Sequence, residues 1–199
     1  MRRALELAWE AFRAGSFPVG AVVLDGTGEV VAEGRNRMGE TQAPDGRLRN
    51  TGLAHAEIDA LAQLPLGDYE DHTLLTTLEP CLLCRSAITM THIGSVDFLA
   101  RDSLCDGLDR LPSINAYAAR RYPTMHGPGT GVDARFAAVL PMAVMLAFNP
   151  DGETMSHYRQ HSGDDVRAAE RIVAGGLWPS KRLDLDGAIA AISSVLLRS

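Results

Sequence analysis

The sequence predicts a three-layer α/β fold, in which a mixed β-sheet lies between layers of helices, with a helical extension at the C-terminus. Two observations support this prediction. Apolar residues at helical spacing alternate with short apolar or β-branched runs through residues 1–100. Alternation of this kind is typical of a sheet that is covered by helices on both faces. After residue 150, two further segments have the apolar stripe of amphipathic helices.

The elements of the first half follow one another closely along the chain. Apolar residues from Leu5 to Phe12 recur at helical spacing, and Gly15 follows the last of them. Asp25–Gly28 is a turn of the type that joins two strands of a hairpin. Polar and glycine-rich residues at 36–53 predict a loop. The predicted helices cover residues 3–14, 54–64 and 80–91. The predicted strands cover 19–24, 73–78 and 96–100, and residues 30–32 begin a further strand that returns from the turn.

The second half is less regular. Prolines and glycines over residues 123–133 predict a loop, and the apolar segment 134–148 fits a helix or a strand. Helices are predicted over 164–173, which begins with acidic residues and ends at glycines, and over 186–197. We therefore divide the chain into a domain of residues 1–150 and a helical extension of residues 151–199 that packs on it.

Composition narrows the classes of function. The 199-residue chain has a net charge of -6 and no arginine-rich run, so it lacks the features of a general binder of phosphate backbones. Three cysteines cannot all pair, which is typical of a reduced cytoplasmic protein. The apolar stretch 136–148 is interrupted by Pro141 and is too short to span a bilayer, so no membrane association is expected.

Two short motifs carry the chemistry. His55-Ala56-Glu57 lies at the start of one predicted helix, and Pro80-Cys81-Leu82-Leu83-Cys84 lies at the start of another. His55, Cys81 and Cys84 supply one nitrogen and two sulfur ligands, which leaves the fourth position of a tetrahedral Zn²⁺ for water. Helix N-termini favour thiolates because they lower the pKa of the thiol. Glu57 then stands beside the metal as a free carboxylate that can move protons.

Two other interpretations of the cysteine pair exist. Cys81 and Cys84 also have the spacing of a thioredoxin-like redox pair, although the accompanying His-x-Glu argues against that role. A structural zinc site would require a fourth ligand, for which Cys105 and His92 are the candidates. Neither lies at zinc-finger spacing, and Cys105 is expected to be an ordinary buried or loop thiol.

H-x-E followed by P-C-x-x-C is the signature of zinc nucleobase deaminases. With the segments Pro18–Val23, Gly34–Arg37, Thr77–Cys84 and Ala100–Asp102, the chain resembles the cytidine deaminase superfamily over residues 3–104. The resemblance is to the branch that holds tRNA adenosine deaminases and small guanine deaminases. It implies a five-stranded mixed sheet in a cytidine deaminase-like fold, zinc bound by His55, Cys81 and Cys84, and Glu57 as the catalytic proton shuttle. It also implies a homodimer.

The resemblance further suggests residues that bind the substrate. Asn36 is expected to hydrogen-bond the substrate, the backbone amide of Ala56 to orient the ring, and Asp102 to contact it. Asn36 equally fits an ordinary turn residue, and Asp102 an exposed loop aspartate. Glu79, between a strand and Pro80, is expected to anchor the backbone.

The predicted function is zinc-dependent hydrolytic deamination of a small amino-substituted heterocycle through zinc-bound hydroxide. Guanine is the preferred candidate substrate, and another free nucleobase, a pterin or a triazine is also consistent with this function. A nucleic-acid partner is not expected, because residues 105–199 lack the basic, aromatic character of an RNA-binding helix. The alternatives are a tRNA adenosine deaminase and a non-catalytic zinc-binding module. Residues 105–199 either cover the pocket or serve in packing and dimer contact, and packing is the simpler role.

Overall fold

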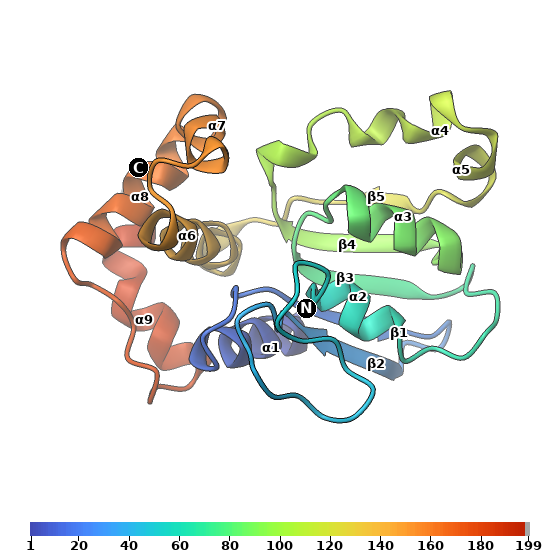
Figure 1. The fold of residues 1–199 in the computed structure, drawn as a ribbon, viewed down its shortest axis with the longest axis horizontal. Helices are drawn as coiled ribbons and strands as arrows, with labels where there is room; N and C mark the ends of the chain where they lie inside the picture. The colour runs from blue at the N-terminus through green and yellow to red at the C-terminus, as the bar shows by residue number, and fades with distance from the viewer. Residues whose placement is uncertain (198–199) are drawn as a thin grey trace.

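In a computed structural model that describes residues 1–197, five strands form one mixed sheet in the order β2-β1-β3-β4-β5 (Figure 1). β1 is antiparallel to both β2 and β3, whereas β3, β4 and β5 run parallel to one another. The five-stranded mixed sheet expected from the resemblance is therefore present. The strands are β1 (Gly20–Leu24), β2 (Val30–Arg35), β3 (Thr73–Leu78), β4 (Ser95–Ala100) and β5 (Thr124–His126).

Helices cover both faces of the sheet because its side chains alternate between them. Ala21 and Val23 of β1 face the cluster formed with α2 (Ala56–Leu61) and α3 (Leu82–Thr91). Val22 points the other way, to α1 (Arg2–Arg13). The three-layer prediction is thus confirmed.

α2 lies unusually close to β2, and Gly34 makes this approach feasible. A Cβ atom at Gly34 would lie 2.2 Å from the carbonyl oxygen of Ala56 and 2.4 Å from the backbone nitrogen of Ala60. Only a residue without a side chain fits there. Since His55 and Glu57 lie at the start of α2, Gly34 fixes the depth at which these two functional residues sit.

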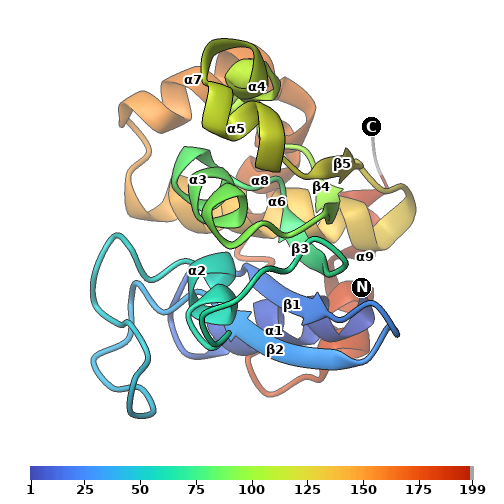
Figure 2. The same cartoon turned by 90° about the vertical axis from the view of Figure 1, so that its right-hand side faces the viewer.

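Short helices connect β4 to β5. They pack at the β4–β5 end of the sheet, where α5 contacts α3 (Figure 2). This segment holds two 3₁₀ turns, η1 (Ser103–Cys105) and η2 (Leu108–Arg110), then α4 (Leu111–Ile114) and α5 (Ala116–Arg121).

The last four described helices lie together at one side of the sheet (Figure 1). Their buried side chains join those of α1 in a single cluster that includes Trp9, Phe136 and Ile192. The indole nitrogen of Trp9 also donates a hydrogen bond to the carbonyl oxygen of Leu183, at 2.9 Å. Residues beyond 150 therefore share a core with the N-terminus. The four helices are α6 (Gly131–Phe148), α7 (Glu153–His161), α8 (Gly163–Ala174) and α9 (Leu185–Leu196).

α6 is the central helix of this cluster. By length and composition it is the one helix within residues 1–197 that meets the criteria for a membrane span. Half of its 18 side chains are buried against other parts of the protein, among them Phe136 and Leu140. This burial is that of a core helix.

Three predicted segments differ from the structure. The predicted loop 123–133 contains β5, a three-residue edge strand whose backbone pairs with β4 without any apolar alternation. The undecided segment 134–148 is helical, despite Pro141 in its interior. The helix predicted over 54–64 is shorter, Ala56–Leu61, because the backbone is extended at His55 and the helix is capped at Ala62.

Candidate metal centre and substrate pocket

Three candidate zinc ligands meet where two helices begin. His55 is the N-cap residue of α2, and Cys81 is the N-cap residue of α3, with Cys84 in the first turn. The Nδ1 atom of His55 lies 3.6 Å from the Sγ atom of Cys81 and 3.5 Å from that of Cys84. The two Sγ atoms are 3.7 Å apart. The structure thus brings together the ligand set that the sequence predicted.

These distances fit a tetrahedral zinc ion. Zn–S bonds of about 2.3 Å and Zn–N bonds of about 2.0–2.1 Å place two sulfurs about 3.8 Å apart, and a sulfur and a nitrogen about 3.6 Å apart. The three distances between His55, Cys81 and Cys84 match this triangle closely. A set of three protein ligands leaves a fourth position open, as catalytic zinc sites do.

The electrostatics of the cluster also suit a cation. Hydrogen bonds from the Cys84 thiol and from His55 lower the pKa of Cys81 to about 4, so this residue is a thiolate at neutral pH. The neighbouring Cys81 thiolate, together with burial, raises the pKa of Cys84. The two thiols therefore share one proton, which a divalent cation would displace.

The alternative fourth ligands lie outside this cluster. The Sγ atom of Cys105 lies 3.4 Å from the carbonyl oxygen of Pro80, to which it donates. His92 is the left-handed C-cap residue of α3 and pairs with Asp68 at 2.7 Å. Neither belongs to the ligand group of His55, Cys81 and Cys84. The residues thus fit an open site better than a closed structural one.

Glu57 is buried directly beside the ligands, with 4% of its surface exposed. Its Oε1 atom accepts a hydrogen bond from the hydroxyl of Thr76 at 3.1 Å, and its Oε2 atom lies 3.3 Å from the Sγ atom of Cys84. Burial raises the pKa of Glu57. A carboxyl group with a raised pKa, held beside an open metal position, is suited to accept and return a proton.

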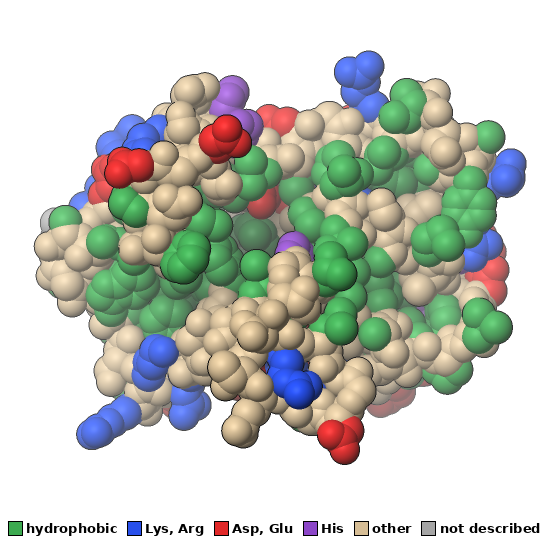
Figure 3. All heavy atoms as spheres, viewed as in Figure 1, with side chains coloured by type: hydrophobic (Ala, Val, Ile, Leu, Met, Phe, Trp, Pro, Cys, Tyr) green, Lys and Arg blue, Asp and Glu red, His purple; other side chains and the backbone are tan. Residues whose placement is uncertain are grey.

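A cavity of about 220 Å³ opens onto this centre. Figure 3 shows the corresponding face of the molecule hollowed in its middle, with hydrophobic side chains around the hollow. Apolar walls and a few polar groups are typical of sites for small planar ligands. The lining includes Phe17, Val19, Met38, Leu78, Leu104 and Met145 as apolar walls, and Asn36, Glu57, Glu79 and Asp102 as polar groups.

All three residues that the resemblance suggests as substrate contacts line this cavity: Asn36, Ala56 and Asp102. The side-chain oxygen of Asn36 accepts a hydrogen bond from the backbone nitrogen of Met38 at 3.0 Å, so the residue also serves as a turn residue. The Oδ1 atom of Asp102 accepts from the backbone nitrogen of Leu104 at 2.9 Å. Asp102 is buried rather than exposed.

The sequence allowed residues 105–199 to cover the pocket but did not identify the residues that do so. Met145 of α6 and Thr154 and Tyr158 of α7 line the cavity. The hydroxyl of Tyr158 donates a hydrogen bond to the Oδ1 atom of Asp102 at 3.0 Å. No local motif marks these residues, because α7 reaches the pocket by packing against η1 and α8. Residues 105–199 thus pack on the domain and also cover one side of the pocket.

A buried ion pair holds the cysteine turn and Asp102 together. The guanidinium of Arg85 pairs with Glu79, and its Nε atom donates to the carbonyl oxygen of Pro80 at 3.0 Å. The Oε2 atom of Glu79 accepts from the backbone nitrogen of Asp102 at 3.2 Å. Glu79 therefore anchors the backbone at Asp102 directly and the backbone at Pro80 through Arg85, as expected from its place before Pro80.

Residues 1–100 match the family model for the cytidine and deoxycytidylate deaminase zinc-binding region. The chain belongs to this family. The match covers α1, the sheet as far as β4, and both helices that carry the metal ligands. The cytidine deaminase-like fold and the zinc cofactor predicted from the sequence agree with it.

Relatives in sequence include proteins that are named for tRNA. The chain is 36% identical over 144 residues to a tRNA(Ile)-lysidine synthase of Deinococcus radiodurans. This alignment covers 70% of this chain and 23% of that protein. The chain is also 39% identical over 106 residues to a tRNA-specific adenosine deaminase of Haemophilus influenzae. This alignment covers 51% of this chain and 57% of the deaminase. The chain thus spans less than two thirds of the length of either relative.

Solved structures similar to this one belong to two classes. One comes from a study of A-to-I editing by tRNA:A34 deaminases, with 28% identity, a TM-score of 0.53, and coverage of 63% of this chain and 94% of that one. Another is a guanine deaminase from Nitrosomonas europaea, with 26% identity, a TM-score of 0.50, and coverage of 71% and 80%. The comparisons therefore agree on the deaminase fold and differ on the substrate.

Proposed function

We propose that the chain is a zinc-dependent aminohydrolase that deaminates a small amino-substituted heterocycle. Guanine or another free nucleobase is the preferred substrate, and pterins and triazines are further amino-substituted heterocycles that could serve as substrates. The observation that supports a small substrate is the pocket wall formed by the C-terminal helices, which covers one side of the pocket. In this wall, Tyr158 of α7 is hydrogen-bonded to Asp102. The similarity to a guanine deaminase also supports it.

The size of the pocket favours a single ring system. A cavity of about 220 Å³ lies below the range of about 300–1,000 Å³ that is usual for drug-sized ligands. Phe17 and Leu78 provide apolar surface, and Asn36 and Asp102 provide polar groups at the edge. A planar heterocycle with amino and carbonyl groups matches this combination.

The chain's own residues would carry the proton transfers. Zinc, when held by His55, Cys81 and Cys84, acts as a Lewis acid that lowers the pKa of water towards about 7. Glu57 takes a proton from the attacking water and delivers it to a ring nitrogen of the substrate. A second proton transfer through Glu57 then converts the amino group into a leaving group. One water is consumed and one ammonia is released, with no oxidant or reductant.

Deamination of adenosine in tRNA is the second candidate. It is favoured by the tRNA-specific adenosine deaminases among the sequence relatives and by the similarity to a tRNA deaminase structure. These similarities run against the expectation that nucleic acid is no partner. The acidic net charge of -6 favours the small molecule instead.

Ammonia release by the zinc-loaded protein tests both candidates. The panel holds guanine, adenine, cytosine, their nucleosides, pterin, triazines and a tRNA anticodon hairpin. The matched control is Glu57→Gln, which keeps the size of the side chain but cannot cycle a proton. We expect the wild type to deaminate a small ring and the turnover rate of Glu57→Gln to be lower by about 10²–10⁴-fold. Mass spectrometry under native conditions should show the same zinc content in both proteins.

Each result points to one function. Turnover of the hairpin alone, with binding that weakens steeply as salt rises, would replace the small-molecule proposal with tRNA editing. If zinc binds but neither class of substrate releases ammonia, the result favours a non-catalytic zinc-binding module and turns the search to substrates outside the panel. Equal activity of wild type and Glu57→Gln would remove Glu57 from the mechanism.

A further inference from the structure

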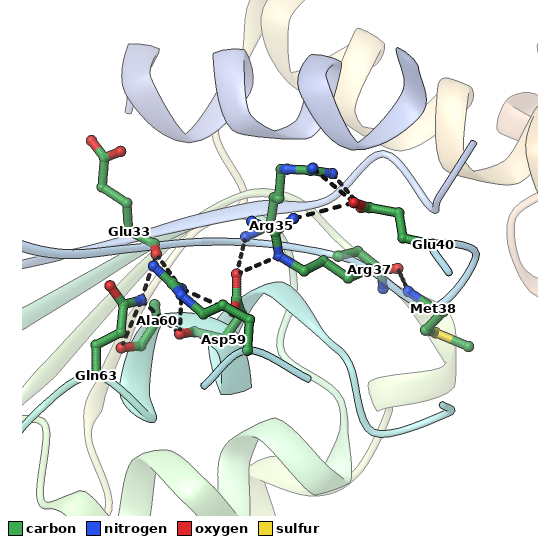
Figure 4. A network of polar contacts seen from close by, with 10 residues as sticks. Glu33, Arg35, Arg37, Met38, Glu40, Asp59, Ala60 and Gln63 are labelled. Carbon is green, nitrogen blue, oxygen red and sulfur yellow. Dashed lines mark hydrogen bonds and ion pairs between the residues drawn. The ribbon is translucent and has the colours of Figure 1, made fainter. Parts of the chain in front are cut away.

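A buried carboxylate on the back of α2 connects the metal centre to the loop that carries Asn36. Asp59 follows Glu57 by two residues, and its side chain is 2% exposed. Its Oδ2 atom accepts hydrogen bonds from the backbone nitrogen of Arg35 at 3.1 Å and from the Nε atom of Arg37 at 3.3 Å. Its Oδ1 atom lies 2.9 Å from a guanidinium nitrogen of Arg47. Figure 4 shows Arg35, Arg37 and Asp59 converging.

The two contacts on Oδ2 come from the residues on either side of Asn36. The backbone nitrogen of Asn36 donates to Val19 at 3.0 Å, and that of Arg37 donates to the carbonyl oxygen of Ala54, just before His55, at 2.9 Å. Because the side-chain oxygen of Asn36 accepts from Met38, its amide NH₂ is the end that is left for a ligand. The direction of this donor is thus set by the backbone around it.

Arg47 extends the same contacts to the polar segment that follows Asn36. Its guanidinium donates to the carbonyl oxygens of Glu33 at 3.1 Å and Asp59 at 3.0 Å. Glu40, in the same segment, pairs with both Arg35 and Arg37. Ion pairs and the hydrogen bonds of Arg47 therefore hold the loop 37–53 against α2 and β2.

We propose that Asp59, through Arg37 and Arg47, is a positioning residue that sets the place of Asn36 relative to His55 and Glu57. The proposal rests on the proposed function, since Asn36 matters only if it meets a substrate. A buried carboxylate that binds two arginines ties their loop firmly, because its removal takes the ion pair from Arg47 and leaves Arg37 paired with Glu40. Misplacement of a substrate-binding group by about 1 Å costs about 10²-fold in rate.

The first test is a double-mutant cycle that pairs Asp59→Ala with Asn36→Ala. We expect Asp59→Ala to lower kcat/KM by about 10–100-fold, chiefly through KM, while zinc content stays at the wild-type level. In the Asn36→Ala background the same substitution is expected to cost less than about twofold, since residues that act through one contact are not additive. A residue that only stabilises the fold gives additive losses, and that result would overturn the proposal.

Two further variants keep the test decisive if Asp59→Ala folds poorly. Asp59→Asn keeps an oxygen for Arg35 and Arg37 and loses only the charge, so its effect on KM is expected to be smaller than that of Asp59→Ala. Arg47→Gln removes one partner from a less buried position. The matched control is Glu33→Gln on β2, which breaks the ion pair between Glu33 and Arg3 of α1 but does not touch the Asp59 side chain. Its kcat/KM is expected to equal that of the wild type.

Hydrogen–deuterium exchange provides a readout that needs no activity. Faster exchange of residues 36–53 in Asp59→Ala and Arg47→Gln, but not in Glu33→Gln, is the expected pattern. Unchanged exchange would overturn the proposal even if the kinetics changed. If the wild type releases no ammonia from any substrate, the proposed function fails, and exchange alone then shows whether Asp59 holds the loop.

Discussion

Asp102 is an acid placed where its charge is costly. Burial raises the pKa of Asp102, and the hydrogen bonds from Leu104 and Tyr158 only partly offset this effect. Both hydrogen bonds end on the same oxygen, Oδ1. The protein thus keeps an energetically unfavourable carboxylate in the pocket wall, which is typical of a residue retained for function.

Asp102→Asn is therefore expected to change how stability depends on pH. A pKa that is raised in the folded state means that the folded protein binds the proton more tightly than the unfolded chain. The contribution of Asp102 is then most favourable below about pH 3.9 and is lost as pH rises through the folded-state pKa. The amide keeps both hydrogen bonds and cannot ionise. In urea unfolding between pH 4 and 8, the free energy of unfolding of Asp102→Asn, relative to that of wild type, should increase as pH rises and then level off.

A constant difference across this range would contradict the inferred cost of ionising Asp102. The enzymatic cost of the same variant belongs to a separate measurement, kcat/KM on the substrate found in the panel.

Residues with a local motif were predictable, and residues brought in from a distance were not. His55, Cys81 and Cys84 follow from spacing, because helix starts put them within reach of one ion. Glu57, two residues after His55, is then buried beside them. Tyr158 carries no such mark, since its role depends on where α7 packs. Asp59 reads as an ordinary helical acid until Arg37 and Arg47 are placed around it.

At the scale of elements, the approach of β2 to α2 controls the metal site. Gly34→Ala places a Cβ atom 2.2 Å from the carbonyl oxygen of Ala56, so α2 must move outward. We expect zinc affinity to fall by at least about tenfold, because tetrahedral sites tolerate only small displacements of their ligands. Competition with a chromogenic chelator measures this loss. Gly163→Ala, at the start of α8, is the control: its new Cβ atom meets only the end of the flexible Arg167 side chain, at 3.3 Å, and it should bind zinc as wild type does.

Elements were predictable where side chains reveal their environment. β3 was predicted over 73–78, as found, because its apolar and β-branched residues mark a buried strand. β5 was missed because an edge strand of three residues is defined by backbone pairing with β4. α6 was undecided because it is apolar on nearly all sides, which hides its period.

At the scale of the whole molecule, the division at residue 150 separates parts that share one core. Leu140 of α6 is fully buried in the cluster that also holds Trp9 of α1 and Ile192 of α9. Arg2 pairs with Asp186 at 2.7 Å, so the two ends of the chain also meet at the surface. Residues 151–197 thus complete the core that α1 and α6 begin.

We therefore expect the protein to unfold in a single cooperative transition. Differential scanning calorimetry should give equal calorimetric and van't Hoff enthalpies, as for a two-state domain. Leu140→Ala should lower the free energy of unfolding by about 2–5 kcal/mol and shift the whole transition, since the cavity weakens both halves at once. Two separate transitions, of which only one responds to Leu140→Ala, would show instead that residues 151–199 fold as an independent extension. Because α7 forms the pocket wall only when this core is intact, loss of activity should coincide with the single transition.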